Sequence, residues 1–137
     1  MKFTIPILVV FFVMSCTNAP KTDTSQIPDI AATSAPAKTL RHVVLFSFKE
    51  TASAANIKEV EAAFSALPTK IKEIQAFEWG LNNSPEGLNK GFTHCYLLSF
   101  KNEAERDTYI THPDHVTFGT VLKPYLEDVL VVDYWNN

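Results

Sequence analysis

Four segments of the chain carry the residue pattern of β-strands. Apolar and polar side chains alternate over residues 40–48, 74–81 and 91–101, where aromatic and β-branched residues are frequent. A period of two places successive side chains on opposite faces, which predicts strands. Residues 128–135 have a continuous apolar centre and form the fourth expected strand.

The stretches between these strands have the apolar spacing of helices. A helix is predicted over residues 54–67, and Pro68 prevents its continuation. Asn102 begins a sequence with the spacing of a capping box, so a second helix is expected to start after it and to end before Pro113. A shorter helical piece is expected over residues 116–122.

The resulting order, βαββαβ, predicts an α+β domain of the ferredoxin-like type. Right-handed crossovers place the helices on one face of a four-stranded antiparallel sheet. The strands over 40–48 and 91–101 are apolar on both faces, yet the helices can cover only one face. Because the other face would expose an unusually large apolar patch, a second copy is expected to cover it. The sequence therefore predicts a homodimer, a dimeric α+β barrel.

The first 38 residues precede this domain, which is assigned to residues 39–137. Residues 1–15 combine Lys2 with a short apolar run, as secretory signals do. The sequence Val13-Met14-Ser15-Cys16 resembles the lipobox of bacterial lipoproteins and implies lipidation at Cys16. An ordinary signal peptide cut near Ala19 is the alternative. Residues 16–38 are rich in Thr, Ser, Ala and Pro and are expected to form a disordered tether. The resemblance implies a lipid-anchored protein of the bacterial cell envelope, either periplasmic or at the outer membrane.

Charge and cysteine content limit the classes of function that the chain can have. The formal net charge is −3, which argues against nucleic-acid binding because such proteins carry a basic patch. The chain has two cysteines, and one of them, Cys16, belongs to the lipobox. Cys95 is then the one cysteine of the domain and is expected to be a small core residue rather than a nucleophile.

Candidate chemistry rests on the four histidines of the chain. His42 and His94 fall on the strand face assigned to the helices. His112 and His115 follow the second helix, with Tyr109 just before them. These side chains are expected to converge on a pocket for a small hydrophobic molecule, whose predicted wall consists of Val44, Phe46, Phe64, Phe77, Tyr96, Phe118, Gly119 and Val121.

Each of these polar residues also has a structural interpretation. His42 and His94 can be buried and hydrogen-bonded to each other or to the backbone, and Tyr109 can be a core residue. His112 can cap a helix end, and His115 can begin the next helical piece. A metal site is not expected, because two histidines at this spacing lack the i,i+4 geometry of a zinc-binding helix. No cofactor is expected.

Several short motifs resemble the stress-responsive A/B barrel (Dabb) family, over the whole of the domain. They are Leu40-Arg41-His42-Val43-Val44-Leu45-Phe46, Trp79-Gly80, Phe92-Thr93-His94, Tyr109-x-x-His112-Pro113-Asp114-His115, Phe118-Gly119 and Asp133-Tyr134. The resemblance implies a ferredoxin-like dimer whose two sheets form a barrel. The family includes plant polyketide cyclases, which implies that His115 is a general base and that Tyr109 hydrogen-bonds the electrophilic carbonyl group.

Two functions follow from the residues and the resemblance together. The first is binding of a small hydrophobic ligand, for which the resemblance implies a stress-related role. The alternative is a cyclase or lyase of aldol type that uses Tyr109 and His115. An exported, tethered protein would not meet a cytosolic polyketide, so the substrate does not carry over. No acidic residue is expected to orient His115, which favours binding.

Overall fold

The computed structural model describes residues 38–137. The predicted signal peptide, the lipidation site at Cys16 and nearly all of the predicted tether lie outside these residues. Within residues 38–137, no helix is long and apolar enough to cross a membrane.

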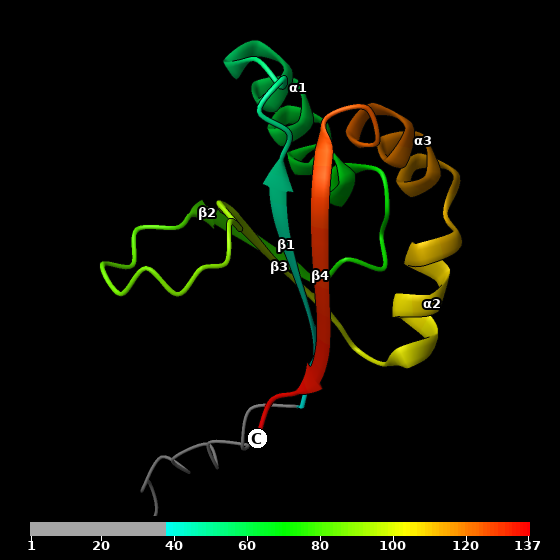
Figure 1. Ribbon diagram of the computed structural model, residues 1–137. Coiled ribbons are helices and arrows are strands. Elements are labelled where there is room, and N and C mark those ends of the chain that lie inside the picture. The colour runs from blue at the N-terminus through cyan, green and yellow to red at the C-terminus, as the bar shows by residue number, and fades with distance from the viewer. Residues whose placement is uncertain (1–37) are drawn as a thin grey trace, which may run out of the picture. The chain divides into compact units, whose positions relative to one another are not determined.

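The described chain has the predicted order of strands and helices, which confirms the ferredoxin-like α+β fold (Figure 1). The second and third strands are shorter than predicted, and the helix before the last strand begins at Pro113, three residues earlier than expected. The elements are β1 (Leu40–Phe48), α1 (Ala54–Ser65), a short 3-10 helix η1 (Leu67–Thr69), β2 (Ala76–Leu81), β3 (His94–Phe100), α2 (Glu103–Thr111), α3 (Pro113–Leu122) and β4 (Leu126–Trp135).

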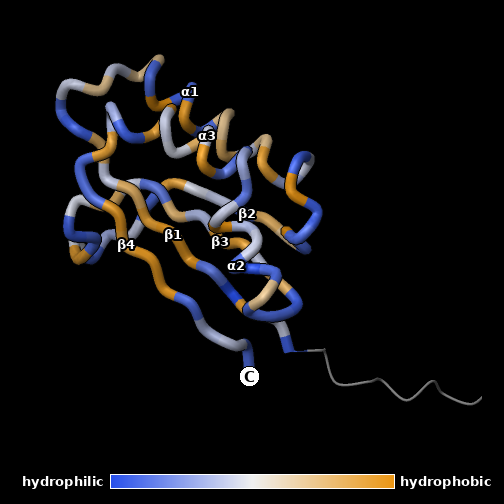
Figure 2. Tube along the Cα trace, turned by 90° about the vertical axis from the view of Figure 1, so that its right-hand side faces the viewer, coloured by the Kyte–Doolittle hydropathy of each residue, from blue (hydrophilic) through white to orange (hydrophobic). Residues whose placement is uncertain are grey.

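The four strands form one antiparallel sheet in the order β2-β3-β1-β4. The helices lie together on one face of this sheet, and the other face carries none (Figures 1 and 2). β1 pairs with both β3 and β4, so that Val44 lies between Tyr96 and Val131. β4 is an edge strand, and the same pairing brings His42 opposite Asp133.

Local capping explains where α2 and α3 begin. The Asn102 side chain accepts a hydrogen bond from the Glu105 N–H at 2.9 Å, as predicted, but the Glu105 carboxylate accepts from the Lys101 N–H and not from Asn102. The His112 side chain accepts from the Asp114 N–H at 3.2 Å and caps α3, with Pro113 at its first position. Pro suits that position because its missing N–H would be unpaired there in any case, which is why α3 begins earlier than predicted.

Aromatic side chains fill the layer between the sheet and the helices. Phe64 of α1 lies 4.3 Å from Tyr96 of β3 and 4.6 Å from Phe118 of α3, measured between ring centroids. The opposite face of the sheet is apolar as well, and Figure 2 shows the apolar stretches of β1 and β4 in orange. On that face Leu130 and Val132 of β4 are exposed in the single chain.

Tyr96 is fully buried, yet its hydroxyl group has no hydrogen-bond partner within residues 38–137. An unpaired buried hydroxyl group costs about 1–3 kcal/mol. We therefore expect Tyr96→Phe to leave the free energy of unfolding unchanged or to raise it by about 1 kcal/mol, as measured by denaturant titration. Destabilisation by Tyr96→Phe would show that this hydroxyl group is bonded.

Candidate functional site

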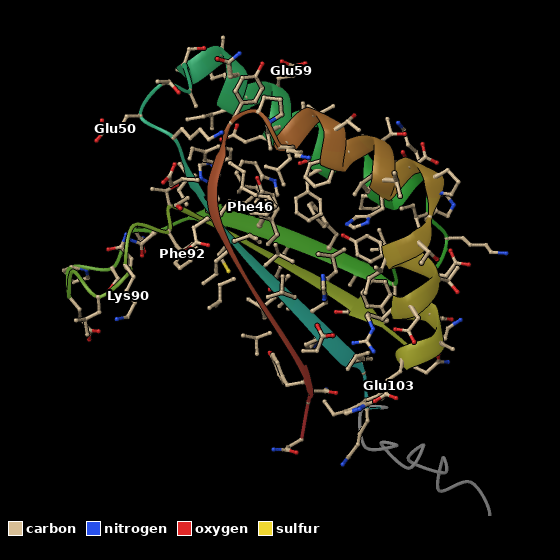
Figure 3. All side chains as sticks on the ribbon, turned by 45° about the vertical axis from the view of Figure 1, so that its right-hand side comes forward. Phe46, Glu50, Glu59, Lys90, Phe92 and Glu103 are labelled. Atoms are coloured by element: carbon tan, nitrogen blue, oxygen red, sulfur yellow. The ribbon has the colours of Figure 1, made fainter. Side chains whose placement is uncertain are left out.

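A cavity of about 360 Å³ lies between the helices and the strands β1 and β4. Figure 3 shows the side chains that fill this layer, with Phe46 among them. Most of the residues predicted for the site line the cavity, namely His42, Val44, Phe46, Phe64, Tyr109, His115, Phe118 and Gly119. Phe77, Tyr96, His94 and Val121 do not line it. Tyr96 and Phe77 instead lie behind Phe64, with ring centroids 4.3 Å and 5.6 Å from it.

His115 is held in one tautomer by the backbone. Its Nδ1 lies 2.9 Å from the carbonyl oxygen of Ile110, in the last turn of α2. Because a carbonyl oxygen only accepts hydrogen bonds, Nδ1 carries the proton of the neutral ring and Nε2 is left as an acceptor. Burial lowers the pKa of His115, the Ile110 hydrogen bond opposes that change, and charge on His42 and His112 lowers the pKa further. The ring is therefore a neutral base at pH 7.

Tyr109 lies between the two histidine rings of the cavity. Its ring centroid is 4.4 Å from that of His115 and 5.7 Å from that of His42. Burial raises the pKa of Tyr109, so the phenol stays protonated and acts as a hydrogen-bond donor. The hydroxyl group makes no hydrogen bond to any other residue between 38 and 137 and is free to donate to a ligand in the cavity.

His42 is oriented by a carboxylate, which the sequence did not predict. Its Nδ1 lies 2.6 Å from Asp133 Oδ1, and the other Asp133 oxygen accepts a hydrogen bond from Arg106 of α2. The expectation that His42 bonds to His94 or to the backbone is therefore wrong. Since the carboxylate accepts from Nδ1–H, the Nε2 of neutral His42 is unprotonated, as it is in His115.

His94 does not join the other histidines. In the pairing of β3 with β1, His94 lies opposite Phe46, whereas His42 lies opposite Leu98. Four strand positions separate them, roughly 13 Å at about 3.3 Å per residue. His94 instead binds Glu61 of α1 at 3.1 Å and Thr93 at 2.8 Å, so the expected convergence of all the histidines on one pocket is wrong.

The remaining predicted polar residue, His112, follows the end of α2 as its structural interpretation expects, but its side chain caps the start of α3, which begins at Pro113 and not at His115. Among residues 38–137 there is no group of three or more His, Cys, Asp or Glu side chains that could hold a metal ion. The cavity residues that sequence reasoning missed are Ile110, Leu122, Leu126, Val129 and Val131. Val129 and Val131 alternate correctly for this face, but the continuous apolar run of β4 hid their orientation.

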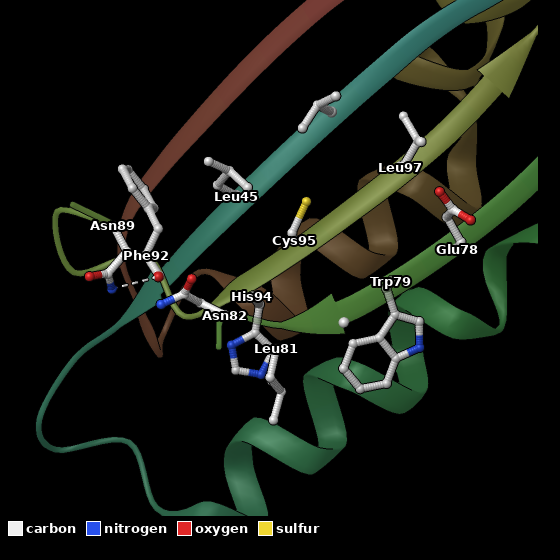
Figure 4. Close-up of a pocket in the computed structure, with 12 residues that line it drawn as sticks. Leu45, Glu78, Trp79, Leu81, Asn82, Asn89, Phe92, His94, Cys95 and Leu97 are labelled. Atoms are coloured by element: carbon white, nitrogen blue, oxygen red, sulfur yellow. Dashed lines mark hydrogen bonds between the residues drawn. The ribbon is translucent and has the colours of Figure 1, made fainter. Parts of the chain in front are cut away.

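A second hollow of about 540 Å³ lies on the opposite, helix-free face of the sheet. Figure 4 shows Leu45, Cys95 and Leu97 projecting together from that face, while the His94 ring points toward α1. Cys95 was predicted to be a small core residue, but it is exposed in the single chain. Burial raises the pKa of its thiol, and the charge of Glu78 raises it further, so the thiol is a poor nucleophile.

The helix-side cavity has the parts needed for acid–base chemistry on a bound carbonyl compound. Two imidazole Nε2 atoms can accept protons, and the Tyr109 hydroxyl group can donate to an oxygen atom that gains charge. The rest of the lining is apolar, with Val44, Phe46 and Phe118 among its members. Such a wall favours a ligand with a hydrophobic body and one polar end.

Similar proteins place this geometry in a family. Residues 40–136 match the family described as the stress responsive A/B barrel domain. The chain is 38% identical to the stress-response A/B barrel domain-containing protein HS1 of Arabidopsis thaliana over 95 residues, which are 69% of this chain and 87% of that protein. It is 27% identical to olivetolic acid cyclase of Cannabis sativa over 95 residues, which are 69% of this chain and 94% of the cyclase.

Solved structures agree with these sequence matches. The hydroxynitrile lyase of Passiflora edulis superposes with a TM-score of 0.69 and is 27% identical, over 74% of this chain and 96% of the lyase. A dimeric ferredoxin-like protein of unknown function from Bacteroides fragilis has a TM-score of 0.58 and 31% identity, over 70% of this chain and 94% of that one. From the match over nearly the whole described domain, the chain belongs to the stress-responsive A/B barrel (Dabb) family.

Proposed function

We propose that the domain binds a small, largely apolar carbonyl compound in the helix-side cavity and catalyses proton transfer on it, as a cyclase or lyase does. The observation that carries this proposal is the juxtaposition of Tyr109 and His115 in an apolar cavity. Their ring centroids are 4.4 Å apart, and the Nε2 atom of His115 is free to accept a proton. The names of two similar proteins, a cyclase and a hydroxynitrile lyase, support the same reaction class.

The two reactions share one requirement that this site meets. In an aldol cyclisation a base removes a proton from the carbon next to a carbonyl group, and the new carbanion attacks a second carbonyl carbon. In hydroxynitrile cleavage a base removes the hydroxyl proton, the carbon–carbon bond breaks, and cyanide leaves with the electron pair. His115 would be the base in either case, and Tyr109 would donate its hydrogen bond to the oxygen atom that carries charge.

Binding without catalysis is the second candidate. Its supporting observation is that, within residues 38–137, His115 has a backbone carbonyl group as its partner and no carboxylate, so its basicity is not enhanced. The two candidates differ in turnover. A protein that binds a carbonyl compound in the cavity and never converts it belongs to the second class.

We also propose that the domain works as a homodimer through the helix-free face of the sheet, as the dimeric neighbours suggest. Attachment to a membrane through Cys16 stays a prediction from the sequence alone.

The proposed reaction is tested with the full-length chain and two probes, mandelonitrile and a linear triketone that can cyclise. We expect faster conversion of at least one probe than in protein-free buffer. The rate should rise with pH to a plateau, because only neutral His115 accepts a proton, and the inflection should lie below 6.5 because burial lowers the pKa of His115. Saturable binding of the probes without conversion would favour the second candidate. If the protein neither binds nor converts either probe, the proposal is contradicted.

A further inference from the structure

A chain of polar contacts runs from the surface of α2 to the His42 ring. Arg106 of α2 donates to one Asp133 oxygen, and the other oxygen lies 2.6 Å from His42 Nδ1. The side chains of Arg106 and Asp133 are 20% and 26% exposed, whereas that of His42 is only 7% exposed. The carboxylate group and the guanidinium group therefore connect the buried imidazole to the surface of α2.

We propose that Arg106 is a positioning residue for His42, which rests on the acid–base function proposed above. Asp133 lies on the edge strand β4 and its carboxylate is partly exposed, so water competes for its oxygens. Arg106 fixes one oxygen through a charge-assisted hydrogen bond, which is stronger and more directional than a neutral one. The other oxygen is then held toward His42, which keeps the proton of the neutral ring on Nδ1 and leaves Nε2 as the acceptor.

The same contact also places Tyr109. Arg106 precedes Tyr109 by three residues, so the two side chains share one side of α2. Within residues 38–137, the contact of Arg106 with Asp133 is the one side-chain hydrogen bond that joins α2 to β4. The Tyr109 and His42 rings meet edge to face, and both line the cavity. Arg106 therefore fixes the donor and one acceptor of the site relative to each other.

A merely structural role for Arg106 predicts something different. Exposed ion pairs contribute little to folding stability, so the loss of this one should hardly change the melting temperature. A positioning role predicts instead a change in the tautomer of a ring that Arg106 does not touch. The local control is Asp107, which also accepts a hydrogen bond from Arg106, at 2.7 Å, but has no contact with His42.

The experiment records the side-chain nitrogen resonances of His42 in the full-length chain, labelled with ¹⁵N-histidine. For the neutral His42 ring we expect a protonated Nδ1 and an unprotonated Nε2 in the wild type, and averaged resonances of both tautomers in Arg106→Met. Arg106→Lys keeps the charge but loses the planar fork, so it should restore the wild-type pattern in part. Asp107→Asn should leave the pattern unchanged. Where the wild type converts a probe, Arg106→Met should lower kcat about tenfold, the size seen when an orienting partner is removed.

An unchanged His42 tautomer in Arg106→Met would overturn the proposal, whatever the rate does. Should Arg106→Met fail to fold, Asp133→Asn is the second variant, because the amide keeps the shape and removes the anionic acceptor. It should produce the same averaging, and an unchanged His42 pattern would again refute the proposal. The nitrogen resonances need no turnover. Conversion of neither probe would therefore count against the proposed function, while the test of Arg106 would still be decided.

Discussion

Replacing His115 by Gln is expected to lower the rate of probe conversion by about 10²–10⁴-fold, the size of a general-base contribution. The glutamine amide is uncharged and can donate a hydrogen bond, so a contact between α3 and the Ile110 carbonyl oxygen of α2 can be kept. What disappears is the unprotonated Nε2. Tyr109→Phe should produce a loss of similar size, because it removes a single hydroxyl group that makes no hydrogen bond within residues 38–137. The measurements are steady-state rates and melting temperatures for each variant.

His112 provides the matched control, because it lies in the same segment three residues before His115. Its side chain caps α3 and does not line the cavity. His112→Ala should therefore lower the free energy of unfolding by about 1 kcal/mol, as the loss of a helix cap does, with little change in rate. The opposite pattern, in which His115→Gln mainly destabilises and His112→Ala mainly slows conversion, would contradict the assignment of His115 as the base.

The fold was accessible from the sequence because its main signals are local. The period of two over residues 40–48 predicts β1 and also shows that this central strand is apolar on both faces. Helix starts were less accessible, as α3 shows. Its first turn is set by Pro113 and by a hydrogen bond to the His112 ring, and imidazole is not among the usual capping groups.

The residues of the site could be predicted from the sequence only where strand periodicity decides which face a side chain occupies. Periodicity places His42 and His94 on the same face, but the distance between them depends on how β1 and β3 are paired. The partner of His42 depends on a pairing across 91 residues, which brings Asp133 beside it. The one available signal was Asp133 itself, an acidic residue directly after the apolar run of β4. The partner of His115 is a backbone carbonyl group, which no side-chain pattern reveals.

The helix-free face of the sheet gives the second large effect. Leu45 lies near the middle of this face, between Cys95 of β3 and Leu130 of β4. In the proposed homodimer the sheet of the second copy covers it, together with the hollow of about 540 Å³ beside it. A glutamate at this position would carry a charge into the buried seam without a partner, at a cost of several kcal/mol. Because a two-fold interface is self-complementary, each substitution acts twice.

Leu45→Glu is therefore expected to convert the protein from a dimer into a monomer. Light scattering should give about twice the chain mass of 15.3 kDa for the wild type and the single chain mass for the variant. The matched control is Val116→Glu, which introduces the same charge at an apolar position of α3 that is 58% exposed and remote from the helix-free face. This variant should remain dimeric. A dimeric Leu45→Glu protein, or dissociation caused equally by Val116→Glu, would place the interface elsewhere. The loss of mass must accompany an unchanged far-ultraviolet circular dichroism spectrum, because the cavity and its aromatic wall belong to a single chain and should survive separation of the sheets.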